Sequence, residues 1–174
     1  YFTNIAMLGI PTYGIRAAAK VRMDEKKLSK TVQEILLINT ISSLVALVIL
    51  FIAIVSIPQL KTEKELYLVL SSAIFLNVMG VEWLYRAVER YSYITIRSIL
   101  GKLLAFIVML MFIKESNDYI VYGVTTIIAS VGFNIFNFIN LFRMVNMKPI
   151  KLSDMDLKKH LKPIFTFFLL SLST

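Results

Sequence analysis

Two long stretches of this chain carry no charged side chain, and they constrain its fold more than any other feature. Residues 35–57 are 23 consecutive uncharged, mostly apolar positions, and residues 119–142 are 24. A helix needs roughly 20 such residues to cross the hydrocarbon core of a bilayer. Because backbone polar groups must be hydrogen-bonded internally in that environment, we predict two complete transmembrane helices here.

Shorter apolar runs extend this prediction along the chain. Residues 66–81 and 103–113 run for 16 and 11 positions before a charge, and each is expected to belong to a further complete span. Residues 1–15 and 164–174 are typical of partial spans, so we expect the chain to be a piece of a longer protein. Only 17% of the residues are charged, against about 25% in soluble domains. The predicted fold class is all-α, a polytopic bundle of transmembrane helices.

The 19 Lys and Arg residues are distributed unevenly between the connections. Segments 16–34, 82–102 and 143–162 hold 16 of them, whereas turns 58–65 and 114–118 hold three. Lys and Arg in short loops mark the cytoplasmic side. We therefore predict a multi-pass membrane protein with the three basic segments inside and the two turns outside. The net charge of +8 then indicates the lipid bilayer, and not a nucleic acid, as the partner.

The connections show no pattern typical of catalysis. They contain no Gly-rich phosphate loop, no HExxH motif and no paired carboxylates at catalytic spacing, and the chain has no cysteine. We expect no enzyme activity, no cofactor and no metal site. The single histidine, His160, lies in a basic run beside the membrane, and we interpret it as a solvated interfacial residue rather than a ligand or base.

Charged residues follow the third predicted span without a turn signal. If that helix continues from residue 66, Glu82 lies about 24 Å from the outer boundary and Arg86 about 30 Å. Glu82, Arg86, Glu89 and Tyr93 would then share one face. Two interpretations are open. The pair forms an interfacial ion pair at the cytoplasmic mouth, with Arg86 reaching the headgroups, or the face lines a water-filled cavity.

Lys102 is the most deeply placed charge. Counting back from Lys114 places it about 18 Å from the outer boundary, where a Lys costs on the order of 3 kcal/mol. Tyr91, Thr95 and Ser98 lie on its side of the helix, and this polar stripe indicates a face turned to the bundle interior. Either the ammonium faces a cavity, or it pairs with a carbonyl or an Asn of a neighbouring helix.

Uncharged polar residues form a second stripe within residues 119–142. Their side chains indicate either hydrogen bonds between helices or a ligand site. The members of this stripe are Tyr122, Thr126, Ser130, Asn134 and Asn137. In residues 35–57, small and polar positions predict close helix packing, and they are Asn39, Ser42, Ser43 and Ala46.

Gly9, Pro11 and Gly14 lie near the end of the first predicted span. Proline removes a backbone hydrogen bond and crowds the preceding turn of a helix. Sharp bends in helices are found mainly at such positions. We therefore predict a hinge at these three residues.

Four stretches resemble the polysaccharide repeat-unit flippases of bacteria, which belong to the multidrug/oligosaccharidyl-lipid/polysaccharide (MOP) exporter superfamily. They are GIPTYGIRAAAKVR (9–22), NVMGVEWLYRAVERYSYITIRSILGK (77–102), FNFINL (136–141) and HLKPIF (160–165). The resemblance implies a fragment of a two-lobed transporter of about 12–14 helices. Residues 1–142 would form most of the N-terminal lobe, from the second to the sixth helix. Residues 143–162 would be the basic cytoplasmic loop between the lobes, and residues 163–174 the start of the next helix.

The resemblance also implies a function. Such proteins move undecaprenyl-pyrophosphate-linked oligosaccharide repeat units across the bacterial inner membrane for O-antigen or capsule assembly, alongside polysaccharide polymerase machinery. Their cavities are cationic, and the polar residues noted above complete a candidate substrate path. Its members are Lys102, Arg86, Glu82, Arg97, Arg16, Thr95, Ser98, Asn134 and Asn137. Two alternatives are a drug or metabolite antiporter of the same superfamily and a membrane-embedded polysaccharide polymerase or glycosyltransferase.

Overall fold

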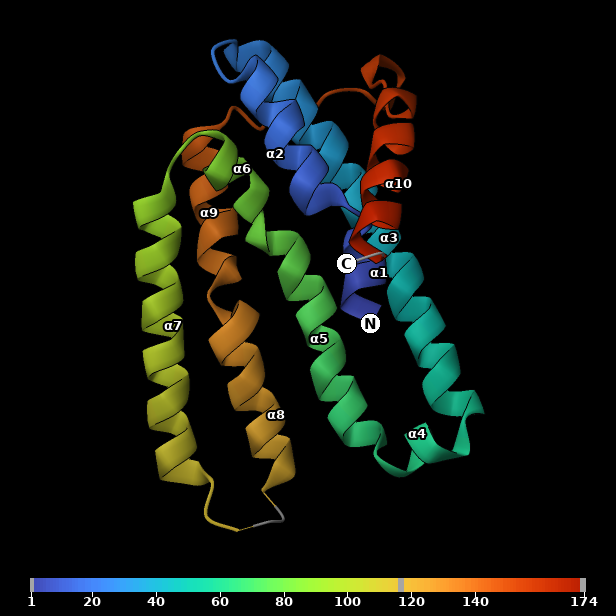
Figure 1. Cartoon of the computed structure of the whole chain (residues 1–174), viewed down its shortest axis with the longest axis vertical. Helices are drawn as coiled ribbons and strands as arrows, with labels where there is room; N and C mark the ends of the chain where they lie inside the picture. The colour runs from blue at the N-terminus through green and yellow to red at the C-terminus, as the bar shows by residue number, and fades with distance from the viewer. Residues whose placement is uncertain (1, 116–117, 173–174) are drawn as a thin grey trace.

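The computed structural model describes residues 2–115 and 118–172, which form a bundle of helices without a strand in those ranges (Figure 1). Four stretches are long and apolar enough to cross a membrane, so the predicted all-α class is confirmed. The extreme ends of both predicted partial spans and part of the turn 114–118 lie outside the described residues. The helices are α1 (Phe2–Met7), α2 (Ile10–Val21), α3 (Glu25–Ser56), α4 (Pro58–Thr62), α5 (Lys64–Gly80), α6 (Glu82–Ala87), α7 (Tyr91–Phe112), α8 (Tyr119–Ile127), α9 (Asn134–Met144) and α10 (Lys158–Leu172).

The first charge-free run lies in α3, which begins well before residue 35. Asp24 caps this helix, because its side chain accepts a hydrogen bond of 3.1 Å from the backbone N–H of Lys27. The same hydrogen bond holds the pKa of Asp24 below its ordinary value. The helix ends at Ser56, because Pro58 restricts the preceding residue, Ile57, to an extended conformation.

The helix that starts near residue 66 does not continue to Tyr93, so the condition under which Glu82, Arg86, Glu89 and Tyr93 would share one face is not met. α5 ends at Gly80, and Val81 turns the chain with a left-handed φ of 40°. A second left-handed residue, Glu89 with φ 60°, separates α6 from α7. Left-handed backbone is unfavourable for residues other than glycine. The surrounding packing therefore holds these two turns in place.

The short helix α6 shows what this packing is. Three consecutive residues, Trp83, Leu84 and Tyr85, are buried on different sides of it. Burial of these three apolar side chains on several sides of α6 stabilises the break in the chain. A straight continuation of α5 would not bury all three. Glu89 is turned away from Glu82 and forms an ion pair with Arg22 at the end of α2.

The chain bends near the first predicted span, although the cause of the bend differs from the predicted one, and a hinge movement there stays a prediction. Leu8 and Gly9 adopt left-handed φ values of 49° and 69° between α1 and α2. Pro11 lies in the first turn of α2, where the absence of its N–H costs no helical hydrogen bond. Gly14 provides space, because a Cβ there would lie 2.7 Å from the Trp83 ring.

Close packing at the polar positions of α3 is confirmed. Asn39, Ser43 and Ala46 are buried, and Ser42 donates a hydrogen bond of 2.6 Å to the carbonyl of Ala6 on α1. Small residues let helices approach closely within a bilayer, where polar side chains join them. α10 packs beside α2. The loop that connects α9 to α10 crosses the end of the bundle at which α2 lies (Figure 1).

Candidate functional site

The break between α5 and α6 places Glu82 at a junction of three helices. Its Oε2 lies 3.5 Å from Arg86 Nη2 on α6, and its Oε1 lies 2.5 Å from Arg97 Nη2 on α7. The two arginines differ sharply, because the side chain of Arg86 is 50% exposed and that of Arg97 is 7% exposed. One carboxylate therefore joins a buried guanidinium to an accessible one. The predicted Glu82–Arg86 pair is present, whereas the contact with Arg97 was not anticipated.

Two asparagines of α9 bind the end of α5, and one of them also binds Arg97. Arg97 donates a hydrogen bond to Asn134 Oδ1. Asn134 Nδ2 donates to the carbonyl of Leu76 at 3.1 Å, and Asn137 Nδ2 donates to the carbonyl of Gly80 at 2.5 Å. Asn137 thereby satisfies the carbonyl of the last residue of α5, which has no helical partner, and Asn134 binds a carbonyl one turn earlier. Their contacts favour the interpretation of these asparagines as hydrogen-bonding groups between helices.

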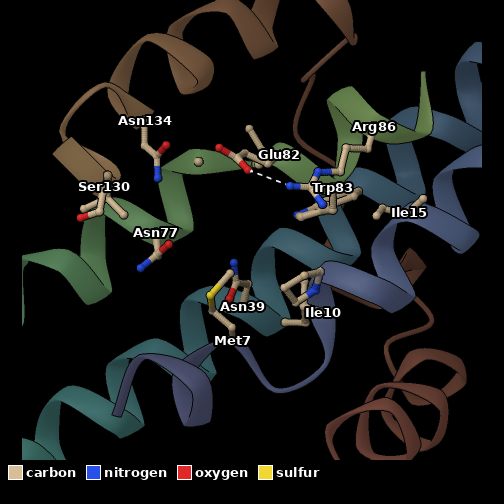
Figure 2. Close-up of a pocket in the computed structure, with 14 residues that line it drawn as sticks. Met7, Ile10, Ile15, Asn39, Asn77, Glu82, Trp83, Arg86, Ser130 and Asn134 are labelled. Atoms are coloured by element: carbon tan, nitrogen blue, oxygen red, sulfur yellow. Dashed lines mark hydrogen bonds and ion pairs between the residues drawn. The ribbon is translucent and has the colours of Figure 1, made fainter. Parts of the chain in front are cut away.

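A cavity of about 250 Å³ lies beside this junction, between α2, α3, α5, α6 and the segment that leads from Ser130 into the start of α9 (Figure 2). Two of the groups around it, Asn39 Oδ1 and Trp83 Nε1, are buried and lack a hydrogen-bond partner among the described atoms. Unpaired buried polar groups are rare, but both atoms are closed off from the cavity in this arrangement, and a side-chain movement would be needed for either to reach a ligand. The other polar side chains that line the cavity are those of Asn77, Glu82, Arg86, Ser130 and Asn134.

A second cavity, of about 280 Å³, contains Lys102. Thr95 and Ser98 line it together with Glu82 and Arg86, which also line the first cavity. The two cavities therefore share a charged wall. No ion pair involves Lys102 among the described residues. Of the two interpretations of Lys102, this placement favours the one in which it faces a cavity.

The remaining candidate residues lie elsewhere. The guanidinium carbon of Arg16 lies 4.8 Å from the centre of the Phe167 ring on α10, a cation–π contact, and Arg16 lines neither cavity. The polar stripe of residues 119–142 is divided by a π-helical turn at Ile128–Gly132. Tyr122, Thr126 and Ser130 are exposed, whereas Asn134 and Asn137 are buried, so the five residues do not form one continuous face.

The interpretation of His160 as a solvated residue is wrong. Its side chain is buried, with Nδ1 at 2.6 Å from the Tyr13 hydroxyl and Nε2 at 2.8 Å from Glu34 Oε2. Glu34 itself is fully buried. One signal in the sequence could have indicated this site, because Glu34 is an isolated carboxylate immediately before the charge-free run of residues 35–57.

Comparison with known proteins agrees with the sequence resemblance. The chain matches the family described as polysaccharide biosynthesis protein over residues 1–174. Neither a curated protein nor a solved structure matches it.

Proposed function

This chain belongs to the polysaccharide biosynthesis protein family, the family of O-antigen and polysaccharide flippases of the MOP superfamily, and we propose that it forms most of one lobe of such a flippase. Family membership and the four apolar helices make it a membrane protein of polysaccharide biosynthesis. The proposed passenger is an undecaprenyl-pyrophosphate-linked oligosaccharide repeat unit. The proposed transport runs from the cytoplasmic to the outer leaflet of the bacterial inner membrane, without catalysis and without a cofactor.

The arrangement of the chain follows from this proposal. Residues 1–142 belong to the N-terminal lobe, and the basic segment 143–162 joins the lobes on the cytoplasmic side. The next helix begins earlier than residue 163, the predicted start, because α10 already starts at Lys158. The chain passes the membrane several times, with the basic segments on the cytoplasmic side. Polysaccharide polymerase machinery is the expected neighbour, because it would use the delivered units.

One observation supports an anionic passenger most directly: Arg86 and Lys102 line the same cavity. A pyrophosphate group loses its hydration when it enters hydrocarbon, at a large cost in free energy. Lys102, which has no ion-pair partner among the described residues, and the half-exposed Arg86, whose charge Glu82 partly balances, supply charge-assisted hydrogen bonds in place of that water. Lys102 lies at the middle of α7, so the countercharge is available at depth in the membrane and not only at its surface.

The neighbouring cavity suits the sugar part of such a passenger. Hydroxyl groups both donate and accept hydrogen bonds, and the amide and hydroxyl side chains of Asn39, Asn77 and Ser130 line this cavity. Glu82 and Arg86 form the wall that both cavities share. A passenger could therefore place its pyrophosphate near Lys102 and its sugars near Asn39, while the lipid tail stays in the bilayer.

The two alternative functions find less support in these residues. An antiporter of drugs or metabolites would not require two cations directed at one cavity. A polymerase or glycosyltransferase requires a carboxylate or histidine that is free to transfer a proton. Glu82 is the only carboxylate among the described residues that line the two cavities, and arginines engage both of its oxygens.

Complementation tests the proposed function. The complete protein, expressed in a strain without its repeat-unit flippase, should restore surface polysaccharide and remove the accumulated lipid-linked units. Arg86→Gln combined with Lys102→Gln should abolish the restoration. The matched control is Lys61→Gln with Lys64→Gln, which removes two exposed cations of an outer turn and should preserve it. Drug resistance without restored polysaccharide would favour the antiporter.

A further inference from the structure

A cluster of buried ionisable groups joins α10 to the first part of the chain. Glu34 on α3 accepts contacts of 2.8 Å from Lys159 Nζ and from His160 Nε2, both on α10. The backbone N–H of Asp156, in the loop before α10, donates to the same carboxylate at 2.8 Å. On the other side of the imidazole, the Tyr13 hydroxyl of α2 lies 2.6 Å from His160 Nδ1. We call Tyr13, Glu34, Lys159 and His160 the α10 clasp.

The basic side chains around this cluster all contact one buried carboxylate, that of Glu34. The Glu34 side chain has no exposed surface and that of His160 is 2% exposed, whereas that of Lys159 is 43% exposed. Lys30, one turn earlier on α3, places its Nζ 4.0 Å from Glu34 Oε1. Removing one partner from a buried charge is strongly destabilising. The clasp therefore holds α10 firmly while it is complete.

The remainder of α10 is held less tightly. Its packing against the bundle lies along α2, where Gly9 approaches the α10 backbone and Arg16 lies over Phe167. Large side chains on its other faces, such as Leu161 and Phe165, are more than half exposed. Pro163 lies inside the helix directly after the clasp. Since proline cannot donate the helical hydrogen bond of its position, α10 has a built-in point of bending there.

These features predict two distinct positions for α10. When it is docked, Glu34 is buried and fully partnered. When it is undocked, water must reach the carboxylate, because a buried charge without a partner is not tolerated. Intermediate positions would leave Glu34 neither paired nor hydrated. Packed elements of this kind switch between two arrangements instead of deforming gradually.

We propose that the α10 clasp is the latch that closes the basic end of the transporter between its two lobes. The proposal rests on the proposed function, in which α10 begins the second lobe and the lobes move relative to each other during alternating access. With the clasp closed, α10 seals against α2 and α3. With the clasp open, α10 moves away from α2 and the passenger can enter from the cytoplasm.

Thiol labelling of the complete protein, with other cysteines removed, tests whether the clasp holds α10. Ile164 is 2% exposed while α10 is docked, so Ile164→Cys should react slowly with a membrane-permeant maleimide. Glu34→Gln should accelerate the reaction by about tenfold, because charged hydrogen bonds to Lys159 and His160 are lost. Glu25→Gln, an exposed carboxylate of the same helix, is the matched control and should leave the rate unchanged.

A second buried thiol separates undocking from unfolding. Ala46→Cys lies in the α3 packing, away from the clasp, and is 1% exposed; it should stay protected in the Glu34→Gln background. If Glu34→Gln exposes both thiols, the milder change Tyr13→Phe decides, since it removes a single hydroxyl. Selective exposure of position 164 in that background supports the latch. Unchanged labelling of position 164 in both backgrounds overturns it.

A locking experiment tests whether the latch opens during transport. Arg16→Cys and Phe167→Cys replace two side chains that touch across α2 and α10, and a short reducible bifunctional reagent can join them. Export of polysaccharide should stop in the locked protein and return after reduction. Undiminished export while locked overturns the latch and leaves the flippase intact. If the complete protein without these cysteines restores no polysaccharide, the proposed function fails. If only the unlocked double-cysteine parent fails, Arg16 or Phe167 is itself needed for export, and the labelling of position 164 decides whether the latch holds α10.

Discussion

Arg97 Nη2 lies 2.5 Å from Glu82 Oε1, and the same guanidinium donates a hydrogen bond to Asn134 Oδ1. This contact joins α6, α7 and α9 at the point where the chain breaks between α5 and α6. The Arg97 side chain is 7% exposed, whereas that of Glu82 is 39% exposed. Arg97 is therefore the buried support of the site, and Glu82 connects it to the cavities.

Arg97→Leu should lower the stability of the complete protein. The buried Asn134 and the partly exposed Glu82 would each lose a charged donor, so the free energy of unfolding should fall by about 2–3 kcal/mol. The matched change Arg86→Leu removes a half-exposed partner of the same carboxylate and should cost less than about 1 kcal/mol. Thermal unfolding of the purified protein in detergent measures both. A larger loss for Arg86→Leu would contradict this assignment of roles.

The exchange of Glu82 and Arg86 provides a second prediction. An isolated ion pair would tolerate Glu82→Arg combined with Arg86→Glu better than either single change. The contact of Glu82 with Arg97 reverses this expectation, because the exchange places a second guanidinium beside a buried one. Export by the double variant should therefore be no better than export by Glu82→Arg alone, at matched membrane abundance. Clear recovery in the double variant would show that Arg97 is not coupled to the pair.

The long helices could be predicted from sequence because their signal is local. A run of more than 20 uncharged residues has few alternatives in a bilayer, and α3 and α8–α9 follow directly from it. The breaks at Val81 and Glu89 carry no such signal, since neither residue favours left-handed backbone. They result from the burial of Trp83, Leu84 and Tyr85, and this burial is known only once the helices are assembled.

In the candidate site too, the features set by local spacing could be predicted from sequence, whereas those set by tertiary contacts could not. Thr95, Ser98 and Lys102 share a helix face by spacing alone, and the structure places all three on one cavity. His160 could not be assigned in this way. Its partners, Glu34 and Tyr13, are 126 and 147 residues away along the chain. A basic run beside the membrane predicted solvation, but tertiary contacts bury the imidazole.

Gly14 provides a test of the packing beneath the site. A Cβ at this position would lie 2.7 Å from the Trp83 ring, and overpacking of this kind typically costs about 1–3 kcal/mol. Gly14→Ala should therefore lower the melting temperature of the complete protein in detergent. Gly132→Ala is the matched control, because its Cβ would meet its nearest neighbour at 3.6 Å, an ordinary contact. Equal effects of the two changes would show that the Trp83 ring can move aside.

The alternation of basic and non-basic connections predicts the orientation of the chain. Thr62 is exposed at the end of α4, so Thr62→Cys should react with a membrane-impermeant maleimide added to intact cells. Ser153 is exposed in the basic loop before α10, so Ser153→Cys should react only after the membrane is permeabilised. The reverse pattern would place the basic segments outside and overturn the orientation inferred from Lys and Arg.

Lys102 provides the sharpest test of the substrate path. It lies at the middle of α7, with Thr95 and Ser98 on the same cavity and without an ion-pair partner among the described residues. If its ammonium binds the pyrophosphate, Lys102→Met removes a charge-assisted contact with the passenger. The variant should therefore reach the membrane at normal abundance and yet fail to restore surface polysaccharide in a strain that lacks the flippase.

Lys102→Arg separates charge from geometry at this position. The guanidinium keeps the positive charge but differs from an ammonium in shape and in hydrogen-bonding directions, so part of the export should remain. A lipid-facing Lys would behave in the opposite way, because Lys102→Met would remove an insertion cost on the order of 3 kcal/mol and raise membrane abundance. Quantitative immunoblotting of membranes, together with surface polysaccharide per cell, distinguishes the two cases. Full restoration by Lys102→Met at matched abundance would exclude Lys102 from the path of the passenger.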